Sequence, residues 1–539
     1  MIYDPLCIAI ILGVWGTVVA LDLYSAQVLC GVVPLISGFF IGILLGDPIT
    51  GTYVGAYLQL MALGLVPIGG KVPLDFEIIT AIIVVSIIVG GVDPYLIPVF
   101  ILSLIPLGVL MKYLEVYARS FNALWIKKAE ESIDKGKLDD ISKWHFLGLL
   151  PLAGVRGFLH VIGAYIMLRW GINALRDLVR EAPTWFFGGL KVVGELLPLL
   201  GFSILLTYMS YEKKYHILLA SFTLSALLTV SDSLIALAVL IVILVRVAWL
   251  WAKGEFEIGS LIYNDQELGK LGKKILRAVT FRSGFLLQCS WNYERMQALG
   301  YLFSILPALK RIYRDNELLK RAAKIHLEFF NTNPFLAPIL VGVNVAIEER
   351  NLGNFELIRS LRRGLMGAFM GIGDGLVIFS VGGILLVMGS VLSLQSMVNP
   401  LYAYVPLIVI LIFDSVFIPF KLKGSELGYK GGLKIIDFLA KEKIKKLKDA
   451  FEQLSLLTMG ALIPVISHLR VSSLSHMAME IKFISTIISI NKFISGVISL
   501  LALLLMKKLY GWYGILFSLL MIFLIGFLLG ALGILTTPI

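Results

Sequence analysis

The chain is poor in cysteine and in charge for its length. Among its 539 residues only Cys7, Cys30 and Cys289 are cysteines, and their scattered positions match neither a disulfide framework nor a zinc-binding spacing. Charged residues make up 15% of the chain, against roughly a quarter in soluble domains. The formal net charge is +11, yet no basic soluble segment is present to carry nucleic-acid binding. No basic N-terminal region and no clear cleavage site accompany the first apolar run, so we expect that run to be retained.

Apolar residues, by contrast, are abundant. They make up 58% of the chain, and the mean hydropathy is +0.89. This composition predicts an all-α polytopic membrane protein, surrounded by lipid. Four runs approach the roughly 20 apolar residues that span a bilayer, namely 27–46, 233–252, 401–419 and 513–532.

Other apolar runs are shorter and are interrupted by glycine and proline. Examples are residues 54–70 and 334–347, one in each half of the chain. A broken segment is tolerated at membrane depth only where protein or a water-filled cavity satisfies its backbone. Broken segments in both halves are typical of a transporter.

The distribution of polar residues predicts two membrane units, residues 1–251 and 275–539. Between them, residues 252–274 drop sharply in hydrophobicity and are interpreted as a linker. Basic residues cluster at 112–144, 310–324 and 421–448, and loops of this kind usually stay in the cytoplasm. Residues 112–144 are rich in both charge signs and helical in character, and we interpret them as a solvated cytoplasmic helix.

Two polar segments lie between largely apolar stretches, where placing polar side chains near the bilayer costs free energy. Residues 290–297 and 326–334 together hold amides, carboxylates, an arginine, a histidine and aromatic rings. These side chains can hydrogen-bond the hydroxyl groups of a sugar and stack on the C–H face of its ring. Polar groups near a bilayer are retained where they pair with one another or bind a ligand. The two segments therefore predict a carrier for a hydroxyl-rich solute.

In the first unit, Gln59 and Asp75 are the candidate ligands. They lie in residues 55–75, where glycines and prolines interrupt helical hydrogen bonding and free main-chain groups for a ligand. Two interpretations stay open, a re-entrant element and a tight turn between helices with glycines for close packing. A packing role alone does not explain a carboxylate at position 75.

In the second unit six polar residues are candidate ligands: Asn292, Glu294, Gln297, Asn331, Asn333 and Asp374. The amides of Asn292 and Gln297 suit sugar hydroxyls but also suit helix caps. Glu294 can contact a ligand or pair with Arg295, and Asp374 can supply a carboxylate or end a helix. Trp291 is more typical of an interfacial anchor than of a stacking platform. No cofactor and no metal site are expected.

Several motifs resemble a known transporter family. In the first half, ILLGD (43–47), LQLMALG (58–64), PIG (67–69) and Asp75 resemble the enzyme IIC component of the mannose family of the sugar phosphotransferase system. The second half resembles the enzyme IID component more specifically. The motifs that carry this second resemblance, in chain order, are SWNYERMQALG (290–300), HLEFFNTNP (326–334), IEE (347–349), GIGD (371–374) and ELGYK (426–430).

The resemblance implies a fused IIC–IID permease, a multi-pass protein of the cytoplasmic membrane that imports a hexose or amino sugar. It implies two facing membrane units with broken or re-entrant helices, a sugar site between them, elevator-type movement and a homotrimer. It also implies separate cytoplasmic IIA and IIB proteins that phosphorylate the sugar, because this chain carries no phosphohistidine donor. An alternative is a carrier of the same fold that works without phosphorylation. A less favoured one is a membrane enzyme acting on lipid-linked sugars, which should show a metal-binding carboxylate cluster on a cytoplasmic loop.

Some positions depart from the family pattern. Gln59 stands where IIC commonly has Glu, GAFMG at 367–371 replaces the usual GPLAG, and Gly375 follows Asp374 where Ser is usual. These departures bear on substrate identity and on coupling to phosphorylation. We expect Gln59 and Asp75 to face the polar residues of the second unit, with the sugar between them.

Overall fold

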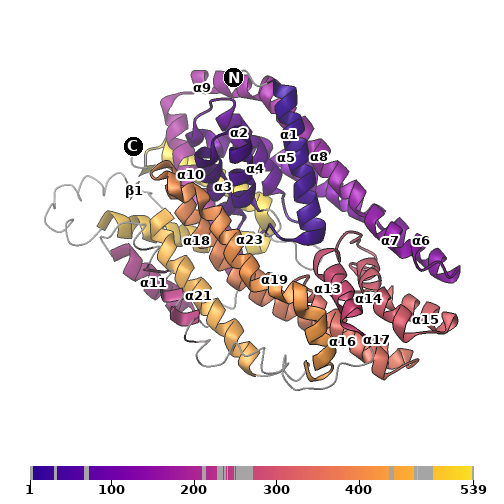
Figure 1. The fold of residues 1–539 in the computed structure, drawn as a ribbon. Coiled ribbons are helices and arrows are strands. Elements are labelled where there is room, and N and C mark those ends of the chain that lie inside the picture. The colour runs from indigo at the N-terminus through magenta and orange to yellow at the C-terminus, as the bar shows by residue number, and fades with distance from the viewer. Residues whose placement is uncertain are drawn as a thin grey trace.

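In a computed structural model the chain is nearly all helical (Figure 1). The structure describes residues 4–29, 33–65, 72–208, 214–227, 271–435, 442–466, 470–471 and 490–536, with several positions between 235 and 249. The first half contains α1 (Pro5–Leu21), η1 (Asp22–Ala26), α2 (Pro34–Leu45), α3 (Pro48–Ala62), α4 (Phe76–Ile88), η2 (Pro94–Leu96), α5 (Ile97–Phe121), α6 (Ala123–Asp134), α7 (Asp140–Leu147), α8 (Leu149–Ile166), η3 (Met167–Gly171), α9 (Ile172–Glu181), α10 (Thr184–Tyr208) and α11 (Tyr215–Leu227). The second half contains α13 (Lys273–Phe285), α14 (Ala298–Ile312), α15 (Asn316–His326), α16 (Ala337–Arg350), α17 (Phe355–Gly373), η5 (Asp374–Gly382), α18 (Gly383–Ser393), η6 (Leu394–Met397), η7 (Pro400–Tyr404), α19 (Val405–Gly431), α21 (Glu442–Ile466), β1 (Arg470–Val471), α23 (Ile490–Ala531) and β2 (Leu535–Thr536).

The membrane character expected from composition is confirmed. Within the described residues, seven helical stretches are long and apolar enough to cross a bilayer: Pro5–Ala26, Ile97–Asp134, Asp140–Glu181, Trp185–Thr207, Phe355–Met397, Pro400–Gly431 and Asp449–Ile466. The all-α prediction holds apart from β1 and β2, two residues each, which pair antiparallel. Most of the predicted linker, residues 252–270, lies outside the described residues, as does the motif at 67–69.

One predicted spanning run is wrong. Residues 27–46 do not form a single helix, because the π-helix η1 ends at Ala26 and the next residue, Gln27, has a left-handed φ of 49°. The Asp22 carboxylate accepts hydrogen bonds from the backbone N–H groups of Val28 and Leu29, which holds the chain out of the helix. Helix α2 starts only at Pro34, a residue suited to the first helical position. The result is a short apolar helix after a break.

Helices α2 and α3 form a tight hairpin that positions Gln59. Asp47 caps α3 by accepting a hydrogen bond from Thr50 N at 3.0 Å. The two backbones approach so closely that a Cβ on Gly38 would lie 2.4 Å from the carbonyl oxygen of Gly51. Glycine permits this approach, as small residues do at many membrane helix interfaces.

The charged segment 112–144 is helical, as predicted, but it forms the end of α5, all of α6 and the start of α7. These helices project beside α14 and α15 of the second half (Figure 1). Ion pairs join Lys310 to Asp139 and Lys324 to Asp134, each at 2.5 Å. The segment therefore packs on the second half instead of standing alone in solvent.

The basic stretch 421–448 is only partly a loop. Lys421 lies inside α19 and is 1% exposed, so its assignment to a basic loop is wrong. Its Nζ donates to the carbonyl oxygens of Ala26, at 2.6 Å, and Gln27, at 3.2 Å. Lys421 thereby ties the second half to the break after η1. Residues 436–441 lie outside the described residues.

Candidate functional site

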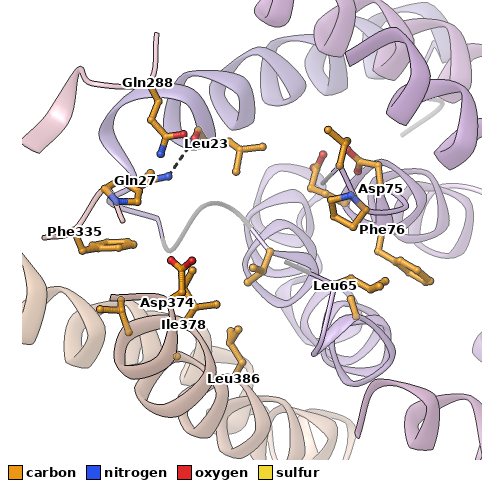
Figure 2. Close-up of a pocket in the computed structure, with 18 of the residues that line it drawn as sticks. Leu23, Gln27, Leu65, Asp75, Phe76, Gln288, Phe335, Asp374, Ile378 and Leu386 are labelled. Atoms are coloured by element: carbon orange, nitrogen blue, oxygen red, sulfur yellow. Dashed lines mark hydrogen bonds between the residues drawn. The ribbon is translucent and has the colours of Figure 1, made fainter. Parts of the chain in front are cut away.

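A cavity of about 270 Å³ lies between the two halves of the chain (Figure 2). Among the described residues, its polar wall from the first half comprises Gln27, Gln59, Asp75, Glu77, Glu115, Arg119 and Arg156. From the second half come Gln288, Trp291, Gln297, Asn331, Thr332 and Asp374. Apolar side chains such as Leu65, Phe76 and Phe335 complete the lining. Small-molecule sites commonly measure roughly 300–1,000 Å³, so this cavity suits one sugar ring.

Two sequence-predicted residues of the first half line this cavity. Gln59 is carried by α3 and is 2% exposed. Its Oε1 accepts one long hydrogen bond, 3.4 Å from Leu35 N. Asp75 caps the N-terminus of α4 and accepts a hydrogen bond from Ile78 N at 3.0 Å. Asp75 therefore both starts a helix and faces the cavity.

Arg156 of α8 organises the carboxylates of this wall. Its guanidinium pairs with Asp75, with Glu77 at 2.8 Å, and with Glu115 at 3.5 Å. The side chains of all four residues are at most 8% exposed. His160, one turn along α8, places Nε2 3.1 Å from Glu77 Oε2. A buried cation shared by several carboxylates gives the wall a fixed geometry.

The carboxylate of Glu77 also accepts hydrogen bonds from α1 and α2. Its Oε1 accepts hydrogen bonds from Trp15 Nε1 at 3.2 Å and from Ser37 Oγ at 2.8 Å. These donors come from α1 and α2, so four helices converge on one carboxylate when α4 and α8 are included. This convergence fixes Glu77 at the cavity wall.

A second arginine links this wall to the other half. Arg119 donates to Glu115 Oε1 at 2.6 Å from Nη2 and at 2.9 Å from Nε. Its guanidinium lies 4.6 Å from the ring of Trp291 and 5.0 Å from that of Tyr24. Trp291 is 5% exposed and lines the cavity, so the interfacial role expected for it is wrong.

In the second half, two loops are joined into one wall. Met296 makes isolated backbone bridges to Asn292 and Phe330, and Gln297 N donates to Phe330 O at 2.8 Å. The Gln297 side chain accepts from Thr332 N at 3.0 Å and donates to Thr332 O at 2.9 Å. Gln297 thus lines the cavity, but both polar atoms of its side-chain amide are already hydrogen-bonded to Thr332, in the loop that carries Asn331.

Asn333 supports Asp374 from outside the cavity. Its Nδ2 donates to Asp374 Oδ1 at 2.9 Å, and its Oδ1 accepts from Phe335 N at 3.0 Å. Asp374 is the first residue of the π-helix η5, directly after α17. Asp374 lines the cavity but does not end a helix, because the helical stretch continues through η5 and α18 to Met397.

The structure does not bring Asn292 and Glu294 into this cavity. Asn292 is fully buried, and its Oδ1 accepts from the backbone N–H groups of Glu294, at 3.1 Å, and Arg295, at 2.9 Å. Its side chain closes a turn and caps no helix, a role that neither alternative above described. The Glu294 side chain is 49% exposed and borders a separate surface hollow. Arg295 lies 3.8 Å from Glu294 and pairs more closely, at 2.7 Å, with Glu130.

Sequence reasoning missed several residues of the wall. Glu77, Glu115, Arg119, Arg156 and Gln27 all line the cavity. A signal was present for Arg156, a charged residue within an otherwise apolar stretch, because such residues are functional candidates in membrane proteins. Glu115 and Arg119 lie in the segment 112–144, which we interpreted as a solvated helix. Charged side chains are common on such a helix and do not by themselves indicate a binding site.

Comparisons with known proteins match both halves. A family model described as the PTS system sorbose-specific IIC component matches residues 6–247, and one described as the PTS system mannose/fructose/sorbose family IID component matches residues 270–535. The mannose-specific EIID component of Escherichia coli K12 is 35% identical over 38% of this chain and 71% of its own length. The chain belongs to the mannose family of the sugar phosphotransferase system.

Other relatives match the two halves separately. The sorbose-specific EIIC component of Lacticaseibacillus casei is 29% identical over 37% of this chain and 69% of its own length. A cryo-EM structure of the mannose transporter ManYZ with microcin E492 aligns at 29% identity over 49% of this chain and 96% of the matched chain, with a TM-score of 0.28. The chain is a fusion of IIC and IID permease components, a multi-pass protein of the cytoplasmic membrane.

Proposed function

We propose that the cavity between the two halves is the sugar site of this IIC–IID permease. A single observation carries the proposal: one cavity of about 270 Å³ is lined by Gln59 and Asp75 from one half and by Asn331 and Asp374 from the other. Carboxylates and amides can orient hydroxyl groups, and Trp291 and Phe335 offer rings against which a sugar's C–H face can pack.

The residues of this site divide into ligands and supports. Gln59, Asp75, Asn331 and Asp374 contact the sugar in this proposal. Gln297 and Asn333 support it instead, since their amides are already bonded to Thr332 and Asp374.

The sugar is a hexose or an amino sugar, and a separate protein phosphorylates it. IIC and IID components work with IIA and IIB phosphoryl carriers in this system. We infer that a IIB protein, charged by IIA, donates the phosphoryl group as the sugar reaches the cytoplasmic side. The family match does not favour a carrier that works without phosphorylation.

A transport experiment tests the function. The purified chain is placed in vesicles that enclose phosphorylated IIB, and labelled sugar is added outside. We expect labelled sugar phosphate to accumulate inside, and only when IIB is phosphorylated. Uptake of unmodified sugar that ignores IIB would instead support the phosphorylation-independent carrier.

A binding experiment tests the site. Replacing Gln59 or Asn331 by Ala should weaken sugar binding by about 0.5–1.5 kcal/mol, and Asp75→Asn by roughly 1.5–3 kcal/mol. These losses correspond to factors of a few to about a hundred in Kd. Glu294→Ala is the matched control, because Glu294 lies outside the cavity. Unchanged affinity in all three cavity variants would place the site elsewhere.

The assembly implied by the family is a homotrimer of fused pairs. We propose this oligomer for the present chain on the resemblance alone. Native mass spectrometry of the purified protein in detergent should show three copies, and a monomer or dimer that retains transport would contradict it.

A further inference from the structure

We propose that Met370 limits the size of the sugar that this site accepts, because its side chain fills the corner of the cavity beside Asn331. The accepted sugars carry nothing larger than a hydroxyl or amino group at the ring carbon that meets Asn331. This inference rests on the proposed function, since it assumes that the cavity holds the sugar. It goes beyond that function because it names a residue that determines specificity.

Met370 lies on the helical face that borders the cavity. Met370, Asp374 and Ile378 line the cavity at intervals of four residues through α17 and η5. Residues three or four apart share one face of a helix. Met366 lies one turn earlier on that face of α17 but does not line the cavity. Met370 is therefore the position at which this face reaches the cavity.

Both methionines contact Asn331. Its backbone N donates to the sulfur of Met366 at 3.1 Å, and its Nδ2 donates to the sulfur of Met370 at 3.5 Å. Further along the same helix, a Cβ on Gly373 would lie 2.3 Å from the Cβ of Asn333. The loop that carries Asn331 is therefore packed tightly on α17, and the side chain of Met370 occupies the space beside the Asn331 amide.

Asn331 keeps its amide available for a sugar in spite of these contacts. A thioether sulfur is a weak acceptor, and the amide NH2 carries a second hydrogen beside the one that points to Met370. The amide of Gln297, by comparison, is bonded to Thr332 through both polar atoms. A hydroxyl oxygen that binds Asn331 Nδ2 lies at about 3 Å from it, and is therefore in contact with Met370 as well.

A larger substituent at that carbon meets the methionine. Methylating or acetylating the hydroxyl group adds carbon atoms where the side chain of Met370 already lies. Methionine is flexible, but moving it aside breaks its contact with Asn331 and displaces it from the loop against which it packs. One extra methyl group in a closely fitting pocket typically weakens binding by about 10- to 200-fold.

Met370 is also particular to this chain, whereas Asn331 is not. Asn331 belongs to the motif HLEFFNTNP (326–334), one of those that carry the resemblance to IID. Met370 belongs to GAFMG (367–371), which replaces the usual GPLAG, so a methionine stands where that pattern has alanine. The hydrogen-bonding amide is therefore common to the family pattern, and the bulk beside it distinguishes this chain.

The test compares a hexose with its methyl ethers. Binding of glucose, mannose and fructose to the full chain is measured by tryptophan fluorescence, since Trp291 lines the cavity. The hexose that binds most tightly is then compared with its ethers, each methylated at a different hydroxyl group. In Met370→Ala we expect the ether at one carbon to gain at least about tenfold in affinity relative to the parent hexose. The other ethers should keep their ratios to the parent.

Two matched variants separate bulk from other effects. Met370→Leu removes the sulfur but nearly conserves the side-chain volume, and it should reject the same ether as the native protein. Met366→Ala removes the other methionine that contacts Asn331, and it should leave the ratios unchanged because Met366 does not line the cavity. The comparison of ethers in the native protein needs no variant, so a variant that fails to fold does not block the test.

A further measurement connects the carbon to Asn331. Asn331→Ala should weaken binding of the parent hexose but not of the deoxy sugar that lacks the hydroxyl group at the carbon identified with Met370→Ala. The reason is that the deoxy sugar has already lost the hydrogen bond, so the two changes are not additive. Non-additivity at a different carbon would place Met370 against another part of the sugar and overturn the inference.

The outcomes separate the two proposals. The inference is overturned, and the proposed function stands, if every ether binds the native protein as tightly as the hexose does. The same holds if Met370→Ala improves none or all of the ethers, or if Met366→Ala improves the same one. Acceptance of the rejected ether by Met370→Leu would assign the effect to the sulfur and also overturn the inference. If no sugar binds at all, the proposed function fails and the size limit fails with it.

Discussion

Removing the guanidinium group of Arg156 should strand the carboxylates that surround it. Arg156→Met keeps much of the side-chain stem but removes every donor. Asp75, Glu77 and Glu115 would then face one another, with side chains 8%, 7% and 6% exposed. We therefore expect the variant to unfold more easily than the native protein.

Two kinds of estimate give the expected loss in the free energy of unfolding. A single hydrogen bond to a charged group contributes about 1.5–3 kcal/mol, and breaking a buried ion pair by removing one partner costs about 3–5 kcal/mol. A stranded carboxyl group can instead take up a proton. From an ordinary pKa near 4, protonation at pH 7 costs about 4 kcal/mol. We expect a loss of about 3–5 kcal/mol at pH 7.

Reversible unfolding of the purified protein in mixed detergent measures this loss. The deficit should shrink as the pH is lowered toward about 4, because protonation of the stranded carboxyl groups in the variant then costs little. Arg180→Met is the control, since Arg180 is 79% exposed, lies 3.8 Å from Asp177 and should change stability by less than about 1 kcal/mol.

Two results would refute this reasoning. One is a loss below about 1 kcal/mol at pH 7, and the other is a larger loss that does not depend on pH, which would indicate lost packing. A second substitution supplies a further check. Adding Asp75→Asn to Arg156→Met removes one stranded charge and should recover part of the stability, whereas independent sites would show additive losses.

Three further predictions follow from the structure. If residues 252–274 only tether the halves, cutting the chain there and co-expressing both parts should preserve uptake. The reason is that contacts such as the hydrogen bond from Asn122 Nδ2 to Trp291 O join the halves directly. Parts that assemble but cannot transport would contradict this prediction. Burial raises the pKa of Glu328, but the hydrogen bond from Arg359 and two further arginine charges outweigh burial and hold that pKa below its ordinary value. Glu328→Gln should therefore lower the unfolding temperature at pH 7 and lose this effect as the pH falls through the acidic range, and a difference independent of pH would exclude the ion pairs as its cause. Gln59→Glu, which restores the family's carboxylate, should change sugar affinity or its pH dependence while the size-exclusion profile stays the same, and affinity unchanged for all transported sugars would remove Gln59 from the site.

The sequence by itself was sufficient for the class of protein and for its family. Apolar runs of near-spanning length predict membrane helices because the bilayer leaves few other options. Motifs such as those at 290–300 and 326–334 identify the IID component because several long motifs in the right order rarely arise by chance. Hydropathy was less reliable at residues 27–46, where it does not register the left-handed Gln27 or the hydrogen bonds of Asp22.

Motif reasoning also found many of the polar residues that line the cavity, including Gln59, Asp75 and Asp374. It could not separate ligands from supports. Asn292 and Asn331 are both amides in polar loops, yet the side chain of Asn292 closes its own turn while Asn331 faces the cavity. The difference depends on which backbone N–H groups lie near each side chain.

Only the tertiary structure decided how the charges are paired. Arg156 meets Asp75 and Glu77 across about 80 positions of sequence, and Gln297 meets Thr332 across 35. Neither pairing has a local signature, because side chains that distant in sequence become neighbours only when α4 packs against α8 and the two loops of the second half join. The same packing places the side-chain amide of Asn333 against Asp374.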